Sequence, residues 1–439
     1  MKIHRFRFTG SCRNASVAAL CIGIIAGLSG PTLAATFCVS QHKPGCATTI
    51  GAAVSAAAAG DTVRVSPGTY KEEVTITKPL ILIGTSNQGV ATIIDATGLA
   101  HAIYVSGVTT GPVVVQQFTA ENANREGILV ENSTTVTITG NTVADNDKSL
   151  NGGKSCAGAF PFDQDDCGEG LHLRATADSI VSNNTVENNA GGILLTDETG
   201  ANHDNVVTGN LVQNNVPDCG ITLPSHPPCM AGSNDIDGCI GGPQIGTPSS
   251  GVFNNVVSRN VSSGNGAAGT GIFAPTPGTA AYSNTVIDNV LTGNGNGGVV
   301  MHSHSPGQNL NNNVIADNTI SGNGGDPDSE GASPAPVGIV VFSNAASGTA
   351  PITGTTISRN TISDEAVDVW VGTTATNLSL HLNNLLGDNS VVGVDNAGTG
   401  TVDATSNYWG CSDGPGSSNC STTSGTVLSV PFLSSAVKQ

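Results

Sequence analysis

The sequence predicts an all-β protein built as one parallel β-helix, a solenoid whose coils each carry three short strands. A short apolar strand opened by glycine recurs along the chain, and asparagine-flanked apolar segments lie between its copies. The glycine-opened copies are Gly127-Ile-Leu-Val, Gly170-Leu-His-Leu, Gly192-Ile-Leu-Leu, Gly220-Ile-Thr-Leu, Gly271-Ile-Phe-Ala, Gly298-Val-Val-Met and Gly338-Ile-Val-Val, with Ala366-Val-Asp-Val and Gly393-Val following.

The asparagine segments supply the other two strands of each coil. Asn205-Val-Val-Thr-Gly-Asn210 is followed directly by Asn210-Leu-Val-Gln-Asn-Asn215, and similar pairs recur in later coils. Coils repeat every 22 to 28 residues, roughly, where no insertion intervenes, and each strand then pairs with its copy one coil away. Leucine-rich repeats have a similar period, but their leucine ladder is missing here. We expect the asparagines to stack at the turns, adopting left-handed backbone and bonding their own main chain.

Both ends of the solenoid predict caps. Residues 48–59 are alanine-rich, with Ile50 and Val54 on one face, which predicts a short helix that ends at Gly60 and covers the first coil. At the other end, Asn407-Tyr-Trp-Gly410 and the cysteine loop behind it predict a terminal cap. The domain therefore spans residues 36–439 without a linker, with caps at 36–60 and about 407–439.

Residues 1–35 have the pattern of a signal peptide. Four basic residues and no acidic residue precede an apolar segment. After this segment, Pro31-Thr-Leu-Ala-Ala35 supplies small residues for cleavage. A transmembrane helix is the alternative, but the apolar segment is short and contains Gly23 and Gly27. We expect a secreted protein, extracellular or periplasmic, that is released rather than anchored to a membrane.

The charge of the chain excludes several partners. The formal net charge is -18, and removal of the four basic leader residues brings it to about -22. Nucleic acid, anionic lipid and bare polyuronate need a positive counter-field, which so acidic a protein does not provide. An anionic polymer stays possible only if a divalent cation bridges the charges. The oligomeric state is not predicted.

The cysteines fit an oxidising compartment. Of the 11 cysteines, Cys38/Cys46, Cys156/Cys167 and Cys411/Cys420 form close pairs that would each close a short loop. Cys219, Cys229 and Cys239 leave one thiol over, and their pairing stays open. A zinc site at this triplet is disfavoured, because the spacing lacks a C-x-x-C motif.

Three motifs carry a resemblance to a known family. The opening Gly60-Asp-Thr-Val-Arg-Val-Ser-Pro-Gly-Thr-Tyr70, the Asn-x-Val repeats and the closing Asn407-Tyr-Trp-Gly410 resemble the right-handed parallel β-helix proteins of the pectin-lyase-like superfamily. The resemblance covers nearly the whole chain after the leader and implies a right-handed solenoid. Because this scaffold hosts many activities, the resemblance implies a substrate class, polysaccharide, and a groove along the coils, but no particular reaction.

The catalytic motifs of the better-known members are missing. The sequence has no Asp-Pro-His of the alginate epimerases, no paired aspartates followed by Gly-His-Gly of the polygalacturonases, and no Arg-x-Pro-x-x-Arg of the pectate lyases. The catalytic residues of these families therefore do not transfer to this chain. Three blocks, including Asp218-Cys-Gly-Ile-Thr-Leu-Pro-Ser-His226, resemble secreted bacterial β-helix proteins without an assigned activity.

The glycine-opened strands predict where a site lies. Counting from each glycine, apolar steps one and three must point inward, so steps two and four face outward. These outward steps carry ionisable and aromatic side chains, and the long insertions at about 148–168, 224–250 and 324–336 flank the same face. We expect a walled groove suited to an extended chain-like ligand.

Histidines and carboxylates on this face are the candidates for proton transfer. The predicted catalytic residues are His172, Asp197, Glu198, His226, His302 and His304. We call the histidines and carboxylates along this face the stripe. The predicted substrate-binding residues are Arg174, the only basic residue near the stripe, Phe273 at step two, Phe342 at step four and Trp370 at step four. The alternative for each single residue is an ordinary solvated side chain.

Two acidic loops raise the question of calcium, the one cofactor that the sequence suggests. Asn234-Asp-Ile-Asp-Gly238 and Asp326-Pro-Asp-Ser-Glu330 place carboxylates at alternating positions, which predicts Asp235, Asp237, Asp326, Asp328 and Glu330 as ligands. Solvated acidic turns are the alternative.

The sequence as a whole favours a secreted polysaccharide-active enzyme, a lyase, glycoside hydrolase or epimerase. A non-catalytic surface protein that binds a carbohydrate or a partner is the alternative, favoured by the missing motifs and by an aromatic content of only 4%. A structural spacer requires nothing beyond the solenoid. Turnover, saturable binding without product, or neither would separate the three.

Overall fold

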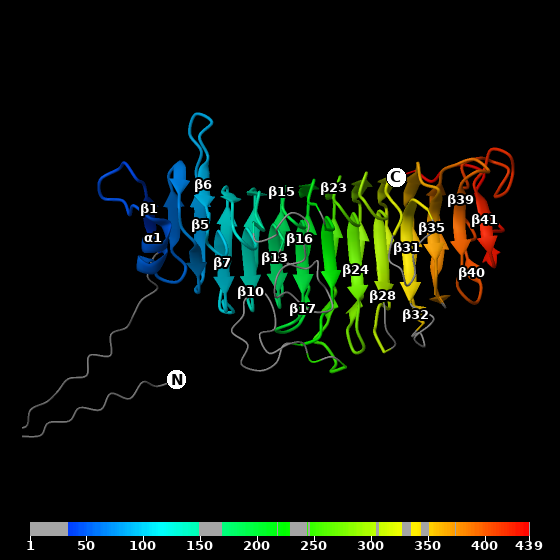
Figure 1. Ribbon diagram of the computed structural model, residues 1–439, viewed down its shortest axis with the longest axis horizontal. Coiled ribbons are helices and arrows are strands. Elements are labelled where there is room, and N and C mark those ends of the chain that lie inside the picture. Colours follow the sequence, from blue (N-terminus) through cyan, green and yellow to red (C-terminus); the bar gives the residue numbers. More distant parts are fainter. Residues whose placement is uncertain are drawn as a thin grey trace, which may run out of the picture. The chain divides into compact units, whose positions relative to one another are not determined.

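A computed structural model describes residues 34–148, 169–216, 218–228, 244, 246–303, 307–326, 335–343, 351–373 and 375–438. Residues 35–439 form one compact unit, separate from residues 1–34. Within this unit three long sheets run side by side, and every strand pairing between their named strands is parallel (Figure 1). Each sheet takes about every third strand of the chain, which confirms the predicted all-β solenoid.

The strands of the three long sheets follow one another in sequence order. The 14-stranded sheet comprises β1 (Thr36–Val39), β2 (Thr62–Val65), β5 (Leu80–Gly84), β8 (Val113–Gln116), β11 (Val136–Thr139), β14 (Ile180–Ser182), β18 (Val206–Thr208), β22 (Val256–Ser258), β26 (Thr285–Ile287), β29 (Val314–Ala316), β33 (Thr356–Ser358), β37 (Ser379–His381), β40 (Val402–Asp403) and β42 (Val427–Leu428). The 12-stranded sheet comprises β4 (Val74–Ile76), β7 (Ile103–Ser106), β10 (Ile128–Glu131), β13 (Leu171–Arg174), β16 (Ile193–Thr196), β20 (Ile221–Pro224), β24 (Thr270–Ala274), β28 (Val299–Ser303), β31 (Val337–Ser343), β35 (Val367–Val371), β39 (Val392–Asn396) and β41 (Thr422–Gly425). The 11-stranded sheet comprises β3 (Gly68–Tyr70), β6 (Thr92–Asp95), β9 (Thr119–Glu121), β12 (Thr142–Ala144), β15 (Thr185–Glu187), β19 (Leu211–Gln213), β23 (Val261–Ser263), β27 (Val290–Thr292), β30 (Thr319–Ser321), β34 (Thr361–Ser363) and β38 (Asn384–Leu385).

Two short sheets are added at one corner of the coils. They comprise β17 (Asn202–His203), β21 (Val252–Phe253) and β25 (Ala281–Tyr282), and then β32 (Ile352–Thr353) and β36 (Ala375–Thr376).

The core lies inside the coils and is made of stacked aliphatic side chains. Ile128, Leu171 and Ile193 occupy the same register position on β10, β13 and β16, and all three are fully buried. Alternate residues of each strand point inward, so one column of like side chains continues from coil to coil at the ordinary strand spacing of about 4.8 Å.

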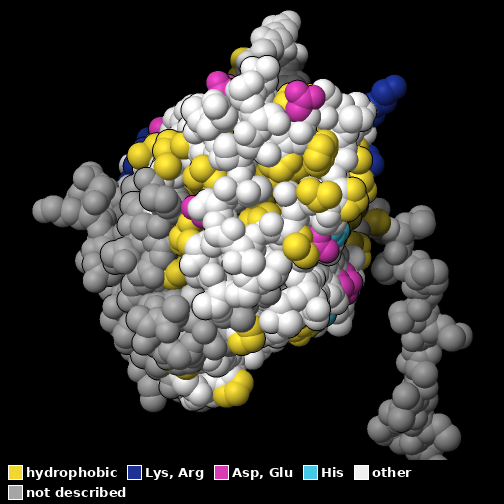
Figure 2. All heavy atoms as spheres, turned by 90° about the vertical axis from the view of Figure 1, so that its right-hand side faces the viewer, with side chains coloured by type: hydrophobic (Ala, Val, Ile, Leu, Met, Phe, Trp, Pro, Cys, Tyr) yellow, Lys and Arg dark blue, Asp and Glu magenta, His cyan; other side chains and the backbone are white. Residues whose placement is uncertain are grey.

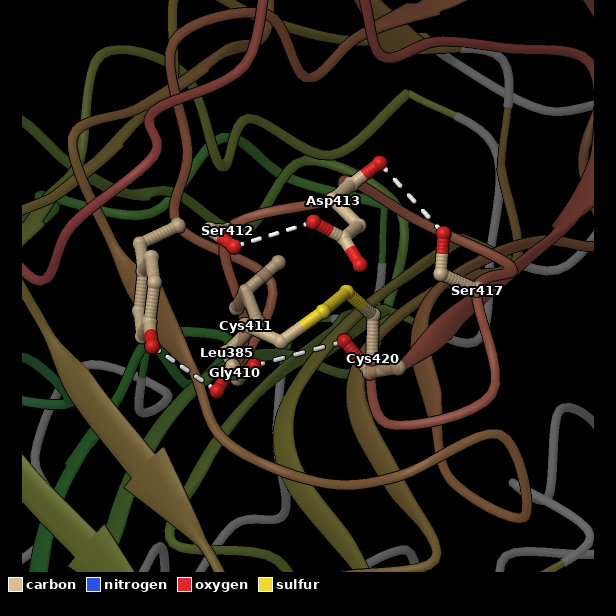
Figure 3. Close-up of a disulfide and its surroundings, with 9 residues drawn as sticks. Leu385, Gly410, Cys411, Ser412, Asp413, Ser417 and Cys420 are labelled. Carbon is tan, nitrogen blue, oxygen red and sulfur yellow. Dashed lines mark hydrogen bonds between the residues drawn. A yellow bond between two sulfur atoms is a disulfide. The ribbon is translucent and has the colours of Figure 1, made fainter.

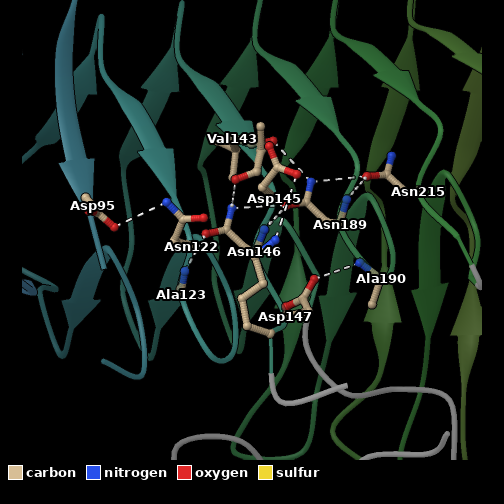
Figure 4. Close-up of polar contacts among 12 residues, drawn as sticks. Asp95, Asn122, Ala123, Val143, Asp145, Asn146, Asp147, Asn189, Ala190 and Asn215 are labelled. Carbon is tan, nitrogen blue, oxygen red and sulfur yellow. Dashed lines mark hydrogen bonds and ion pairs between the residues drawn. The ribbon is translucent and has the colours of Figure 1, made fainter. Parts of the chain in front are cut away.

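Asparagine ladders form the corners of the coils. The longest ladder consists of Asn141, Asn184, Asn210, Asn260, Asn289, Asn318, Asn360, Asn383 and Asn407. Within it the side-chain amide of Asn210 donates to Val181 O at 3.0 Å and to Asn260 Oδ1 at 2.9 Å, while Asn210 Oδ1 accepts from the backbone N–H of Asn184 at 2.9 Å. Figure 4 shows the second ladder at Asn146, Asn189 and Asn215.

The predicted stacking of these asparagines is confirmed, whereas their predicted backbone and bonding are confirmed only in part, since some of them do bond their own main chain, as Asn289 does to Ile287 O. The left-handed conformation belongs to the residue before each ladder position, for example Asn183 with φ 55° and Gly209 with φ 67°. The ladder asparagine itself bonds mainly to neighbouring coils. The reason is that its side chain is buried at the corner, where backbone groups of the adjacent coils would otherwise lack partners.

The N-terminal cap contains the predicted helix in shortened form. Helix α1 spans Ile50–Ala56, and its first backbone N–H groups donate to the carboxylate of Glu72 at 2.7 and 2.8 Å. Ile50 and Val54 are buried against the first coil, as expected. Strand β1 also lies in this segment, where it pairs with β2 and so belongs to the solenoid.

The C-terminal segment closes the other end. Trp409 is fully buried, and the predicted disulfide between Cys411 and Cys420 is formed beside Gly410 (Figure 3). Strands β41 and β42 continue two of the sheets within the predicted cap. Figure 2 looks onto this end, where apolar and polar side chains are intermingled and Lys and Arg are visible only at the margin.

The predicted disulfide between Cys38 and Cys46 is formed as well. Cys219 is a buried free thiol in the described part of the chain, whereas Cys156, Cys167, Cys229 and Cys239 lie outside it.

Candidate functional site

The outer face of the 12-stranded sheet carries the predicted site residues in the expected alternation. On β13, His172 and Arg174 alternate with the core residues Leu171 and Leu173. Strands β13, β16 and β20 are neighbours, and β28 lies two strands beyond β20. The predicted order of the stripe along the coils is therefore confirmed.

Two positions on this face were predicted in the wrong register. Phe273 pairs with His302 and therefore occupies step four rather than step two, because Gly269 and not Gly271 takes the strand-opening position. Trp370 pairs with Val340 at step two rather than step four, since the strand-opening position of that coil is taken by Asp368. Both side chains still face outward, because each shift is by two residues.

The expected open groove is not what the structure shows between β10 and β20. Every residue of β10, β13, β16 and β20 is buried on both faces of the sheet. The charged side chains are buried there in contact with one another, which is the arrangement that makes buried charge tolerable.

The carboxylate of Glu126 contacts two histidine side chains. His172 Nδ1 lies 3.0 Å from Glu126 Oε1, and His101 Nδ1 lies 3.0 Å from Glu126 Oε2. Although burial acts to raise the pKa of Glu126, the hydrogen bonds and positive charge of the two imidazoles hold that pKa well below its usual range. Because the carboxylate can only accept, Nδ1 of His172 carries a proton.

The other nitrogen of His172 faces a hydroxyl group. Nε2 of His172 lies 2.8 Å from Thr196 Oγ1 on the next strand. In the neutral ring this nitrogen accepts the hydroxyl proton, and in the protonated ring it donates. His172 can thus take up and release a proton at Nε2 while Glu126 keeps the ring oriented.

A second carboxylate, Glu131, neutralises Arg174, the one arginine in the described strands of the 12-stranded sheet. Arg174 Nη2 donates to Glu131 Oε1 at 2.9 Å, and the Tyr104 hydroxyl donates to Glu131 Oε2 at 2.6 Å. Burial, together with the hydrogen bond to Glu131, raises the pKa of Tyr104 to about 12. Tyr104 is only partly buried, so this end of the cluster reaches the solvent.

Glu198 and His226 form a third pair. His226 Nδ1 lies 2.9 Å from Glu198 Oε1. Burial opposes ionisation, but the hydrogen bond and charge of His226 prevail and lower the pKa of Glu198 to about 2. We call His101, Tyr104, Glu126, Glu131, His172, Arg174, Glu198 and His226 together the ionisable cluster.

Asp197 lies beside the cluster but contacts mainly backbone. Its carboxyl oxygens accept from the N–H of His226 at 2.7 Å, the N–H of Gly251 at 2.6 Å and the hydroxyl of Ser225 at 3.0 Å. It therefore joins the two ends of the long insertion between β20 and β21. Burial raises the pKa of Asp197 to about 6, against the opposing effect of the backbone donors.

His302 occupies a more exposed part of the same face. Its Nδ1 lies 3.3 Å from Asp326 Oδ2, and its ring packs on Phe273 with the centroids 4.5 Å apart. Phe273 and His302 are partly exposed, whereas Phe342 and Trp370 are buried and stacked with centroids 5.9 Å apart.

Most of the predicted calcium ligands lie outside the described residues. Asp326 contacts His302, while His304, Asp235, Asp237, Asp328 and Glu330 lie outside the described residues. Among the described residues no group of three or more His, Cys, Asp or Glu side chains could hold a metal ion. Calcium binding stays a prediction.

The sequence prediction missed Glu126, His101 and Tyr104. His101 and Glu126 occupy the position just before the strand-opening residue on neighbouring coils, and Glu169 repeats it on the next. The recurring Glu126-Gly127 and Glu169-Gly170 at the start of these strands were the available signal.

The same face is covered differently farther along the sheet. Around β28, β31 and β35 its outward side chains form an apolar cluster that includes Val300, Val340, Phe342 and Trp370. The fold can therefore cover this face with apolar side chains, and the charges between β7 and β20 are not needed for that purpose.

These features define the class of protein. Residues 81–253 match the family model described as right handed beta helix region. The parallel solenoid of the structure and this match over residues 81–253 agree with the right-handed parallel β-helix that the resemblance in the sequence implied.

Solved structures and curated proteins add little beyond the fold. An alginate lyase from Paenibacillus sp. is 11% identical, with 79% of this chain and 97% of that chain covered and a TM-score of 0.42. The A-module of an Azotobacter vinelandii mannuronan C-5 epimerase is 13% identical (89% and 95% covered, TM-score 0.41), and a surface adhesin of Streptococcus pneumoniae is 11% identical (80% and 88%, 0.37). No curated protein matches the sequence. At such identities these matches carry no argument about activity.

Proposed function

We propose that this protein acts on an extended polysaccharide at the outer face of the 12-stranded sheet, with His172 transferring protons. The observation that carries the proposal is the ionisable cluster itself. Burying charged groups generally stabilises a fold less than apolar side chains of similar size do, and the same face is apolar only a few coils away. Clusters of buried ionisable groups are typical of functional sites.

The roles follow from the contacts. Glu126 orients His172, whose Nε2 is the proton-transfer atom, and Arg174 and Tyr104 are held by Glu131 for contact with a sugar. The reaction is a lyase, hydrolase or epimerase reaction, since each needs a proton taken up or released near neutral pH.

The protein is further proposed to be secreted. Two disulfides close short loops at the two ends of the solenoid, and disulfides persist in oxidising compartments. Among the described residues, no helix is long and apolar enough to cross a membrane.

The test is turnover of a polysaccharide panel, followed by new reducing ends and by the ultraviolet absorbance of unsaturated uronic products. We expect the wild type to release product from one polymer and His172→Ala to lose at least about 100-fold in rate, as removal of an acid-base group does. His42→Ala changes an exposed histidine between β1 and α1 in the N-terminal cap; it is the matched control and should keep full activity. Full activity of a folded His172→Ala would overturn the proposed role.

A second candidate, non-catalytic binding of a polysaccharide, is favoured by one observation. Most of the ionisable cluster is buried, whereas the Phe273 and His302 rings are partly exposed and in contact. This candidate predicts saturable binding without product, lost in Phe273→Ala and unaffected in His172→Gln.

A further inference from the structure

The ionisable cluster has no positive charge left for an anionic ligand. Arg174 contacts Glu131, His226 contacts Glu198, and both His101 and His172 contact Glu126. Each basic side chain thus already contacts a carboxylate at about hydrogen-bonding distance, with the two histidines sharing Glu126. Asp197 adds a further acidic group beside them, and its oxygens accept from backbone N–H and hydroxyl groups rather than from a base.

Among the described residues beside the cluster, Lys148 is paired with Asp145. Arg125, in the turn before β10, is half-buried and engaged in a contact of its own. The chain as a whole carries a net charge of -18. A polyuronate would bring a carboxylate to a cluster that is at best electrically balanced, within a protein of the same sign.

Two buried polar atoms in the cluster are left without partners. Among the described residues, neither Arg174 Nε nor Glu198 Oε2 has a hydrogen bond, although both side chains are more than nine-tenths buried. They lie on neighbouring coils, since Arg174 pairs with Thr196, two residues before Glu198. One atom is a donor and the other an acceptor. A hydroxyl group can bond to either of them, because it both accepts and donates, whereas a carboxylate can only accept.

Resting on the function proposed above, we infer that the polysaccharide is a neutral glycan, recognised through its hydroxyl groups, and that Glu131 excludes uronates by neutralising Arg174. Of the three proposed reactions such a glycan allows hydrolysis, because β-elimination and C-5 epimerisation need the carboxylate of a uronate. Arg174 then donates hydrogen bonds to sugar hydroxyl groups instead of binding a carboxylate of the substrate. This assigns specificity to Glu131 and Glu198, which have no role in the proton transfer proposed above for His172.

The test compares polymers that differ only in charge. Polygalacturonate and mannuronan are each paired with their own carboxyl-reduced product, and a panel of neutral glucans, mannans and xylans is added. Affinity of the full chain is measured by retention on each immobilised polymer at 0.15 M and 0.5 M NaCl. We expect the neutral member of at least one pair, or a panel glycan, to bind at least tenfold more tightly than any uronate. That preference should persist at 0.5 M NaCl, where the Debye length falls to several ångströms and long-range repulsion is screened.

Glu131→Gln provides the matched variant. Removing this charge leaves the Arg174 guanidinium unneutralised, so affinity for uronates should rise and the preference should narrow at least threefold. The control is Glu187→Gln, which makes the same charge change on the outer face of β15, where Glu187 bonds to Gln213 at 2.7 Å. It should leave the preference unchanged.

The outcomes separate the two proposals. Uronates bound as tightly as neutral polymers at 0.5 M NaCl would overturn the neutral-glycan inference while the polysaccharide function stands. No binding to any polymer would overturn the proposed function and this inference with it. If Glu131→Gln does not fold, the wild-type comparison at high salt decides alone.

Discussion

Substitution of Asp197 tests whether this residue acts in chemistry or in holding the scaffold. Asp197→Ala removes the acceptor of two buried backbone N–H groups, those of His226 and Gly251. Each buried donor left without a partner costs about 1 to 3 kcal/mol, so the variant should lose roughly 2 to 6 kcal/mol when the carboxyl is neutral.

The loss should depend on pH. The folded pKa of Asp197, about 6, lies above the ordinary value of 3.8 for this side chain, so the native state binds the proton more tightly. The contribution of Asp197 to stability is complete below pH 3.8 and falls by about 3 kcal/mol as the pH rises to 6. The destabilisation by Asp197→Ala should therefore be about 3 kcal/mol larger at pH 4 than at pH 7.5.

Urea denaturation of the wild type, Asp197→Ala and Asp197→Asn at both pH values measures these differences. Asp197→Asn keeps one oxygen acceptor and does not ionise. The unfolding free energy of this variant should therefore lack the pH dependence that Asp197 contributes in the wild type. His302→Ala is the comparison, because His302 is another predicted catalytic residue on this face but is partly exposed. This variant should change the unfolding free energy by less than about 1 kcal/mol. Unchanged unfolding midpoints for both Asp197 variants together with lost turnover would refute the scaffold role and restore Asp197 as a catalytic residue.

Three further predictions concern stability. The Glu198–His226 pair should contribute stability above pH 4.5 that is lost as the pH falls toward 2, because the folded pKa of Glu198 is lowered to about 2; acid unfolding of Glu198→Gln should lack this component. Burial raises the pKa of Glu365 to about 7, so its contribution to stability falls as the pH rises from 4.5 to 7, and Glu365→Gln should raise the unfolding midpoint at pH 8 but not at pH 4. Asn210→Ala leaves the buried Asn184 N–H without its acceptor and should cost roughly 1 to 3 kcal/mol in urea unfolding, whereas exposed Asn389→Ala should stay within about 0.5 kcal/mol; equal midpoints for these two would contradict a structural role of the ladder.

The fold could be predicted because its determinants are local and repeated. The glycine-opened strands and the asparagines at the corners recur in nearly every coil, so the strand order follows from the sequence alone. Register is less secure where two glycines compete. In Gly269-Thr-Gly271 either glycine could open the strand, and the sequence does not show that Gly269 meets Asn294 at the corner.

The site could be predicted only in part. The outward histidines were visible because alternation along a strand assigns each residue to a face. Their partners were not, since His172 meets Glu126, 46 residues earlier, and His226 meets Glu198, 28 residues earlier. Contacts at such separations depend on which coil lies beside which, and the sequence pattern does not specify how side chains on neighbouring coils pair.

The asparagine ladder has a consequence for how this chain can change. Asn210 and Asn260 are 50 residues apart, while Asn260 and Asn289 are 29 apart, yet the amide bonds across the two steps are 2.9 and 3.0 Å long. The corner bond is thus indifferent to the length of chain that leaves and re-enters between two rungs. Segments can be lengthened, shortened or exchanged along one side of the molecule without altering the geometry of the next coil. New loops can therefore be tried over the same outer face while the surface beneath them keeps its spacing.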